Sequence, residues 1–225
     1  MNETAAAARR TAAILDLDGT LVDSNYHHAL AWYRAFRESD VVLPIWQLHR
    51  HVGMGGDKYV AAVAGDDVEQ RLGDKLRRSW EHHFNELLPE IQPCDGAREL
   101  IVQLRARGHR VVVATSAIQS HFDTFIDDKL SARALADDWT TTDDVANSKP
   151  APDLVTAALA KAGTSAAVMV GDTPWDCQAA ERAGIQTICL LTGGFSQAEL
   201  RAAGAAAVYE SPRSLAERLD ETALA

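Results

Sequence analysis

The sequence predicts an α/β fold in which a parallel β-sheet alternates with helices and carries one helical insertion after its first strand. Short apolar runs alternate with longer helical patterns along most of the 225 residues, which is the order of a parallel sheet. Between about residues 24 and 92 no convincing strand is found and the pattern is helical. The length suits one core of ordinary size with a small accessory module.

Six strands are predicted from apolar runs that end at polar or turn residues. Glycines at 108, 163 and 184 each close a helix before the next strand, a capping box begins at Ser196, and Ser211-Pro212 opens the last helix. The strands are expected at about Ala12–Asp16, Val111–Thr115, Trp139–Thr141, Val168–Val170, Thr187–Leu191 and Ala206–Tyr209.

The insertion is expected to form amphipathic helices over Tyr26–Glu38, Asp57–Ala64 and Val68–Leu88. Hinges are expected near Val22–Ser24 and Pro89–Pro93. An insertion placed directly after the first strand can fold over the carboxyl edge of the sheet, where ligands of such sheets bind. We expect Trp32, Trp46 and Trp80 in the core of the insertion. The histidines at 49, 51, 82 and 83 have no carboxylate partner at metal spacing, and we expect them on helix surfaces.

The most informative motif is Asp16-Leu-Asp18-Gly19-Thr20, directly after the first apolar run. Two carboxylates at the end of a buried strand are costly to desolvate unless a cation or a chemical role offsets them. A tight turn at Gly19 can bring both toward one point, and Thr20 can hydrogen-bond within that turn. One carboxylate can then act as a nucleophile and its neighbour as general acid and base.

Three later strands also end in groups that suit a phosphate or a cation. Thr115 and Ser116 offer hydroxyls, and Lys149 can neutralise carboxylates and a phosphoryl group. Asp172 follows the fourth strand, with Asp176 one turn into the next helix. Oxygen ligands from Asp16, Asp172 and a backbone carbonyl suit Mg²⁺ better than zinc.

Taken together, these four segments resemble the signature motifs of the haloacid dehalogenase (HAD) superfamily, in its phosphatase branch. The resemblance implies a Rossmann-like catalytic core, residues 1–22 and 93–225, and a helical C1-type cap, residues 23–92. In the phosphoglycolate phosphatases and β-phosphoglucomutase-like members, such a cap lies at this position.

The resemblance also implies roles for individual residues. Asp16 looks like the nucleophile that forms an aspartyl-phosphate, Asp18 like the general acid and base, Thr115 like the phosphate-binding hydroxyl and Lys149 like the charge stabiliser. The expected metal residues are Asp16, Asp18, Asp172 and Asp176, the last being an outer-sphere group or a partner of Lys149. The expected substrate-binding residues are Thr20, Ser116, His28, Gly55, Gly56 and Lys58.

Several of these assignments stay open at this point. His27 stands beside His28 and could take its place, the glycines could form a plain interhelical turn, and Lys58 could be a solvated lysine at a helix start. The function expected is Mg²⁺-dependent hydrolysis of a small soluble phosphate monoester. A phosphomutase and a non-catalytic phosphate-binding protein are alternatives. Thr20 disfavours the mutase, since mutase relatives tend to carry an apolar residue there, and Asp18 disfavours a dehalogenase. A non-catalytic protein would be expected to have lost at least one of Asp16, Asp18, Lys149 and Asp172.

Composition excludes some partners. The net charge of −10 and the pI near 5.2 argue against nucleic acid or an anionic membrane. Three cysteines without metal spacing and the absence of a transmembrane run favour a reducing, cytoplasmic location. The Ala-rich stretch ending in Arg9-Arg10 is expected to be a disordered lead-in rather than a signal. Neither the substrate nor the oligomeric state follows from the sequence.

Overall fold

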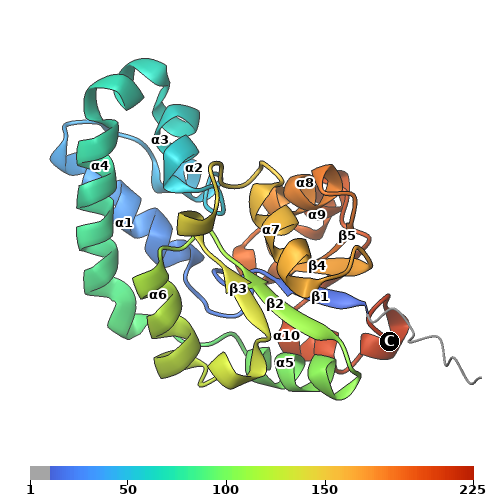
Figure 1. The fold of residues 1–225 in the computed structure, drawn as a ribbon. Helices are drawn as coiled ribbons and strands as arrows, with labels where there is room; N and C mark the ends of the chain where they lie inside the picture. The colour runs from blue at the N-terminus through green and yellow to red at the C-terminus, as the bar shows by residue number, and fades with distance from the viewer. Residues whose placement is uncertain (1–10) are drawn as a thin grey trace, which may run out of the picture.

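The computed structural model describes residues 11–225, which contain a six-stranded parallel sheet in the order β3-β2-β1-β4-β5-β6 (Figure 1). The α/β fold is therefore confirmed. Every predicted strand forms, with ends that differ from the prediction by one residue. The strands are β1 (Ala12–Leu15), β2 (Arg110–Ala114), β3 (Asp138–Thr140), β4 (Ala167–Gly171), β5 (Gln186–Leu190) and β6 (Ala207–Tyr209).

Strand β1 is central, between β2 and β4, and each of its residues is buried. Leu15, its last residue, lies beside Val113 of β2 and Val170 of β4. Because all three strands run in the same direction, the residues that follow them meet at one edge of the sheet. The motifs at the ends of these strands are brought together in this way.

The two faces of the sheet are covered by different helices. Ala13 and Leu15 pack into a core with α5 (Ala97–Ala106) and α10 (Pro212–Ala216), whereas Ala12 and Ile14 pack against α7 (Asp153–Ala162) and α8 (Pro174–Arg182). This division follows from the alternation of side chains along a strand. The remaining helical segments of the core are α6 (Gln119–Asp123) with a π-helical turn at Thr124–Lys129, α9 (Gln197–Ala202), and 3₁₀ turns at Arg133–Leu135, Thr142–Asp144, Leu191–Gly193 and Leu219–Glu221. A further 3₁₀ turn, Leu88–Glu90, belongs to the insertion.

The predicted helix boundaries in the core are confirmed. Gly163 ends α7 in the left-handed conformation with φ of 68°, a conformation in which glycine is not strained. Ser196 and Ser211 each form a capping box at the start of α9 and α10.

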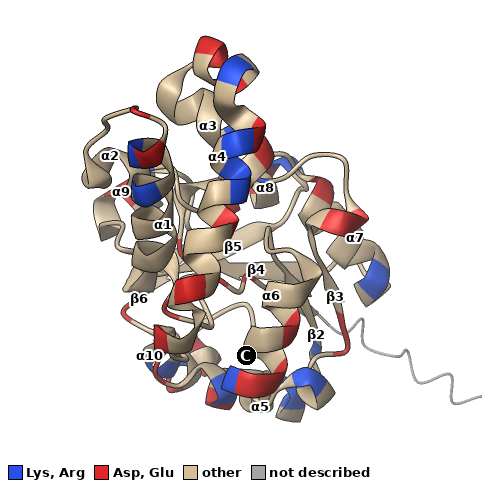
Figure 2. Ribbon diagram, turned by 90° about the vertical axis from the view of Figure 1, so that its left-hand side faces the viewer, with Lys and Arg blue, Asp and Glu red and all other residues tan. Residues whose placement is uncertain are grey.

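The insertion after β1 consists of α1 (Asn25–Glu38), α2 (Ile45–His49), α3 (Gly56–Ala64) and α4 (Asp66–Leu87), which lie together on one side of the sheet (Figure 1). Helix α2 was not predicted, since five residues are too few to show a helical period. Basic and acidic residues are interspersed along α4 (Figure 2).

The two segments that join the insertion to the sheet pair with each other. Val22 and Pro93 form an antiparallel bridge, and the amide of Asp23 donates to the carbonyl of Gln92 at 2.9 Å. This crossing lies at the predicted boundary between core and insertion. The expectation for the stretch ending in Arg9-Arg10 lies outside the described residues. Within residues 11–225, no helix combines the length and the apolar character needed to cross a membrane.

Candidate active site

A buried ion-pair cluster lies at the carboxyl end of β1. The Nζ atom of Lys149 lies 2.6 Å from Oδ1 of Asp16 and 2.7 Å from Oδ1 of Asp176. All three side chains are buried, with Lys149 only 1% exposed. Burial alone would lower the pKa of Lys149, but the two carboxylates outweigh it and raise that pKa, so the side chain is a cation. Lys149 is therefore placed to bind both acids at once.

Asp172 lies beside this cluster and is held by two neutral donors. The Thr20 hydroxyl donates to its Oδ1 at 2.6 Å, and the Asn25 amide donates to its Oδ2 at 2.8 Å. The contact from Thr20 differs from the expected bond within its own turn. Asn25 was not predicted, because its role depends on how α1 folds back against the core. Asp172 is thus fixed by one residue of the first motif and one of the insertion.

Asp176 has a double role that its position in the helix explains. It is the third residue of α8, and its Oδ2 accepts from the backbone amide of Thr173 at 3.0 Å and from the Thr173 hydroxyl at 2.7 Å. This capping box leaves Oδ1 for Lys149. The sequence pattern Gly-Asp-Thr-Pro-Trp-Asp therefore sets both the helix start and the orientation of the lysine.

The carboxylate oxygens of Asp16, Asp172 and Asp176 suit a hard divalent cation. One carboxylate oxygen from each lies within 4.8 Å of the others, and all three residues are buried. Burial raises the pKa of Asp16 to about 8 despite the Lys149 ammonium, and burial with the neighbouring carboxylates raises the pKa of Asp172 well above its usual range. The single positive charge of Lys149 cannot balance the three negative charges of the ionised carboxylates. A bound cation would add positive charge and favour their ionised form.

Asp18 is not one of the three acids whose carboxylate oxygens cluster, and its side chain bonds to the insertion. Its Oδ1 accepts from the Ser24 hydroxyl at 2.6 Å and lies 3.0 Å from Nε2 of His28. Burial alone would raise the pKa of Asp18, but the contacts from His28 and Ser24 outweigh it and the pKa lies below its usual value. Of the two adjacent histidines, His28 is the one that reaches this acid. Ser24 was not predicted.

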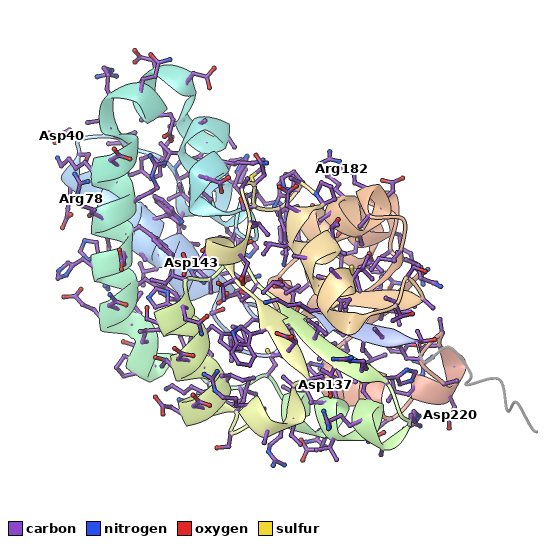
Figure 3. The ribbon with its side chains drawn as sticks, in the orientation of Figure 1. Asp40, Arg78, Asp137, Asp143, Arg182 and Asp220 are labelled. Atoms are coloured by element: carbon purple, nitrogen blue, oxygen red, sulfur yellow. The ribbon has the colours of Figure 1, made fainter. Side chains whose placement is uncertain are left out.

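A cavity of about 60 Å³ opens beside these residues, and its wall combines the sheet edge with the insertion. Asp16, Asp18, Ser116 and Lys149 line it from the core, and His28 lines it from α1. The Thr115 hydroxyl accepts from the amide of Ala117 at 3.0 Å, and Thr115 is not among the residues that line the cavity. Figure 3 shows side chains between the helices of the insertion and the sheet.

The glycine loop of the insertion touches both the cavity and the core. Gly56 lines the cavity. Gly55 packs against Ser148, and a Cβ at this position would stand 2.2 Å from the serine hydroxyl oxygen. Asp57 accepts a hydrogen bond from the same hydroxyl. Lys58 does not line the cavity, although it follows directly. The loop therefore forms a close contact between insertion and core.

Three expectations outside the motifs need correction. Trp46 is 67% exposed rather than part of the core, because α2 is a short outer helix. His49 is buried rather than on a helix surface, and its Nε2 lies 2.9 Å from the carbonyl of Gly193. His82 and His83 do have a nearby carboxylate, Glu86, but His82 is exposed and His83 pairs with both Glu38 and Glu86 as in surface ion pairs.

The sequence of residues 13–190 matches the family of haloacid dehalogenase-like hydrolases. The chain belongs to this family. A hydrolase from Pseudomonas syringae is similar in structure, with a TM-score of 0.88 and 33% identity over 94% of this chain and 99% of that one.

Two relatives in sequence are named as phosphatases. A phosphoglycolate phosphatase from Rhodospirillum rubrum is 31% identical over 92% of this chain and 90% of its own length. A validoxylamine A 7'-phosphate phosphatase from Streptomyces hygroscopicus subsp. limoneus is 29% identical over 80% of this chain and 85% of its own. These relatives act on different phosphate esters.

Proposed function

We propose that the protein is a phosphatase that hydrolyses a small phosphate monoester through an aspartyl-phosphate on Asp16, with Mg²⁺ as its cofactor. The observation that carries this proposal is the contact of Asp16 with Lys149 at the floor of a cavity that Asp18 also lines. A nucleophile, a fixed cation and a second acid are the groups that phosphoryl transfer requires. The phosphatase relatives support the same reaction class.

The first half of the reaction forms one bond and breaks one. An Asp16 carboxylate oxygen attacks phosphorus, and the bond between phosphorus and the ester oxygen breaks. Asp18 gives its proton to that oxygen, so the alcohol leaves neutral. Lys149 offsets charge on the transferring group.

The second half returns the enzyme to its starting state. Asp18, now a carboxylate, takes a proton from water, and the water oxygen attacks phosphorus. The bond between phosphorus and the Asp16 carboxylate oxygen breaks, inorganic phosphate leaves, and Asp16 is again a free carboxylate while Asp18 holds the proton taken from water. The contacts of Ser24 and His28 favour the carboxylate form of Asp18, which is the form that this step needs.

We propose that Asp16, Asp172 and a backbone carbonyl of the first motif hold the metal ion, while Asp176 orients Lys149. When bound, Mg²⁺ would offset negative charge on the phosphoryl group. Thr20 and Asn25 fix the carboxylate of Asp172 for this purpose.

We further propose that residues 23–92 act as a cap over the core of residues 1–22 and 93–225. The pairing of Val22 with Pro93 supports a defined crossing between the two parts. Of the proposed substrate-binding residues, His28, Gly56 and Ser116 have support from their place on the cavity wall. Gly55 and Lys58 would act less directly, through the contact of the cap with the core.

A phosphate-release assay tests the proposal. A panel of phosphate monoesters is offered with Mg²⁺ and, in parallel, with EDTA. We expect release of inorganic phosphate with at least one ester, its loss in EDTA and its return with added Mg²⁺. Isomerisation of a sugar phosphate without phosphate release would instead identify a mutase, and binding without turnover a non-catalytic protein.

A further inference from the structure

The cavity has an aromatic wall that three separate helices of the insertion build. Trp32 of α1, Tyr59 of α3 and Trp80 of α4 all line it. The ring centroid of Trp32 lies 4.4 Å from that of Tyr59 and 5.3 Å from that of Trp80, both pairs being stacked. The side of the cavity that the insertion contributes is therefore an aromatic cluster, and a leaving group that extends from Asp16 toward the insertion would meet it.

This wall offers few polar groups to a ligand. The hydroxyl of Tyr59 is already used, because it donates to the carbonyl of Leu48 at 2.7 Å. His121, on the same cavity, has its Nε2 2.8 Å from Oδ1 of Asn85. Burial lowers the pKa of His121 to about 4, so its ring is neutral at neutral pH.

Three further polar groups belong to lining residues: Nε2 of His28, which lies 3.0 Å from Asp18, and the Trp80 indole nitrogen and the Ser116 hydroxyl, which have no partner among the described residues. Apart from these groups, the leaving group meets carbon.

The cavity also lacks a spare positive charge. Among the described residues that line it, Lys149 is the one lysine or arginine, and its Nζ is bound by Asp16 and Asp176. In the proposed reaction the positive charge of Lys149 also offsets charge on the phosphoryl group, so it is not available to a second anion. A second anion on the substrate would find no lysine or arginine beside it.

A neighbouring cleft of about 340 Å³, which shares Trp80 and Ser116 with the cavity, does not supply that charge either. It carries two arginines and two acids, Arg77, Arg78, Asp57 and Glu81. Arg77 is further paired with Glu69 and Asp74, each at 2.8 Å. The cleft as a whole is close to neutral.

We infer that the substrate is the phosphate ester of a neutral alcohol that presents an apolar or aromatic face to Trp32, Tyr59 and Trp80, and that a second anionic group on the alcohol is selected against. The inference rests on the proposed function and names its substrate class. An unpaired carboxylate held against aromatic carbon loses hydration without gaining a partner. Esters such as 2-phosphoglycolate, whose leaving group carries a carboxylate, are therefore expected to be poor substrates.

Two matched esters test this directly. Phenyl phosphate and 4-carboxyphenyl phosphate share the ring and the scissile bond and differ in one charge. We expect kcat/KM of the wild-type protein with Mg²⁺ to be at least about tenfold higher for phenyl phosphate. We also expect 2-phosphoglycolate to be no better than 4-carboxyphenyl phosphate. Equal or higher kcat/KM for either carboxylate ester would overturn the inference. Absence of phosphate release from every ester would instead overturn the proposed phosphatase function.

A charge introduced into the wall gives a second test. Trp80→Lys places a cation at the cavity and should raise kcat/KM for 4-carboxyphenyl phosphate relative to phenyl phosphate by about tenfold. Trp46→Lys is the matched control, because Trp46 is 67% exposed on the same insertion and does not line the cavity. The same shift in both variants would show that the wall does not set the selectivity. If Trp80→Lys does not fold, the comparison of phenyl phosphate with 4-carboxyphenyl phosphate on the wild-type protein still tests the inference.

Discussion

The ammonium of Lys149 lies 2.6 Å from the carboxylate of Asp16, and both side chains are almost completely buried. The pair joins β1 to the loop before α7, two segments far apart in the sequence. Its surroundings include two more buried carboxylates, Asp172 and Asp176. We therefore expect the lysine to contribute both to the stability of this edge and to the proposed chemistry.

Replacing Lys149 by methionine removes the one charge that neutralises this edge. We expect loss of activity toward all esters together, since each transition state carries the same phosphoryl charge. Breaking a buried ion pair typically costs about 3–5 kcal/mol in the free energy of unfolding, unless the acids take up protons or a cation. Steady-state kinetics and urea unfolding measure both effects. Lys75→Met, at an exposed site on α4, is the control and should change neither.

Metal binding can be measured without turnover. We expect Asp172→Asn to weaken Mg²⁺ binding by at least about tenfold in isothermal titration calorimetry, because a carboxylate ligand becomes a neutral amide. The carbonyl oxygen of the new amide can still accept a hydrogen bond from Thr20 or Asn25, so the variant should keep its fold. Asp128→Asn, an exposed control, should bind Mg²⁺ like the wild type. Unchanged affinity in Asp172→Asn would remove this residue from the metal site.

His28→Gln should change how kcat depends on pH. His28 holds the pKa of Asp18 below its usual value, so its removal raises that pKa. The water-activating step needs the Asp18 carboxylate, and the acidic limb of the kcat profile should therefore move to higher pH. His27→Gln is the control, since His28 and not His27 contacts Asp18. An identical acidic limb in wild type and His28→Gln would show that His28 does not act on Asp18.

Stability should fall in acid partly through His121. Burial is the main cause that lowers its pKa to about 4 in the folded protein, against an ordinary value of 6.5. Between these values the unfolded chain binds more protons, so the free energy of unfolding decreases as pH falls from about 6.5 to about 4, by on the order of 2 kcal/mol. His121→Phe should reduce that slope in urea unfolding curves, whereas His82→Gln, at an exposed site, should not. Equal slopes would exclude His121 as the cause.

The strands and the four motifs were predictable because their signals are local. An apolar run, a polar end and a following helix start lie within a few residues of each other, as in Val168–Val170 followed by Asp172 and Asp176. The parallel order then brings their ends to one edge. These parts of the fold were predicted to within one residue.

The contacts that cross between insertion and core were not predictable in this way. Ser24 and Asn25 reach Asp18 and Asp172 only because α1 folds back over the sheet edge. His49 is buried because its ring meets the carbonyl of Gly193, which lies far along the chain. The aromatic wall likewise needs three helices that are separate in sequence. No local pattern carries this information.

In the proposed mechanism Asp16 carries the phosphoryl group during turnover, and acid-quench mass spectrometry can detect this intermediate. The wild-type protein is mixed with phenyl phosphate, or with the best ester found, and quenched within one turnover. Peptide mapping should then find one added phosphoryl group on the peptide that contains Asp16. Asp16→Asn should remain folded by circular dichroism, lose several orders of magnitude in kcat and show no added phosphoryl group. Phosphate release at the wild-type rate by Asp16→Asn, or a phosphoryl group on another residue, would contradict the mechanism.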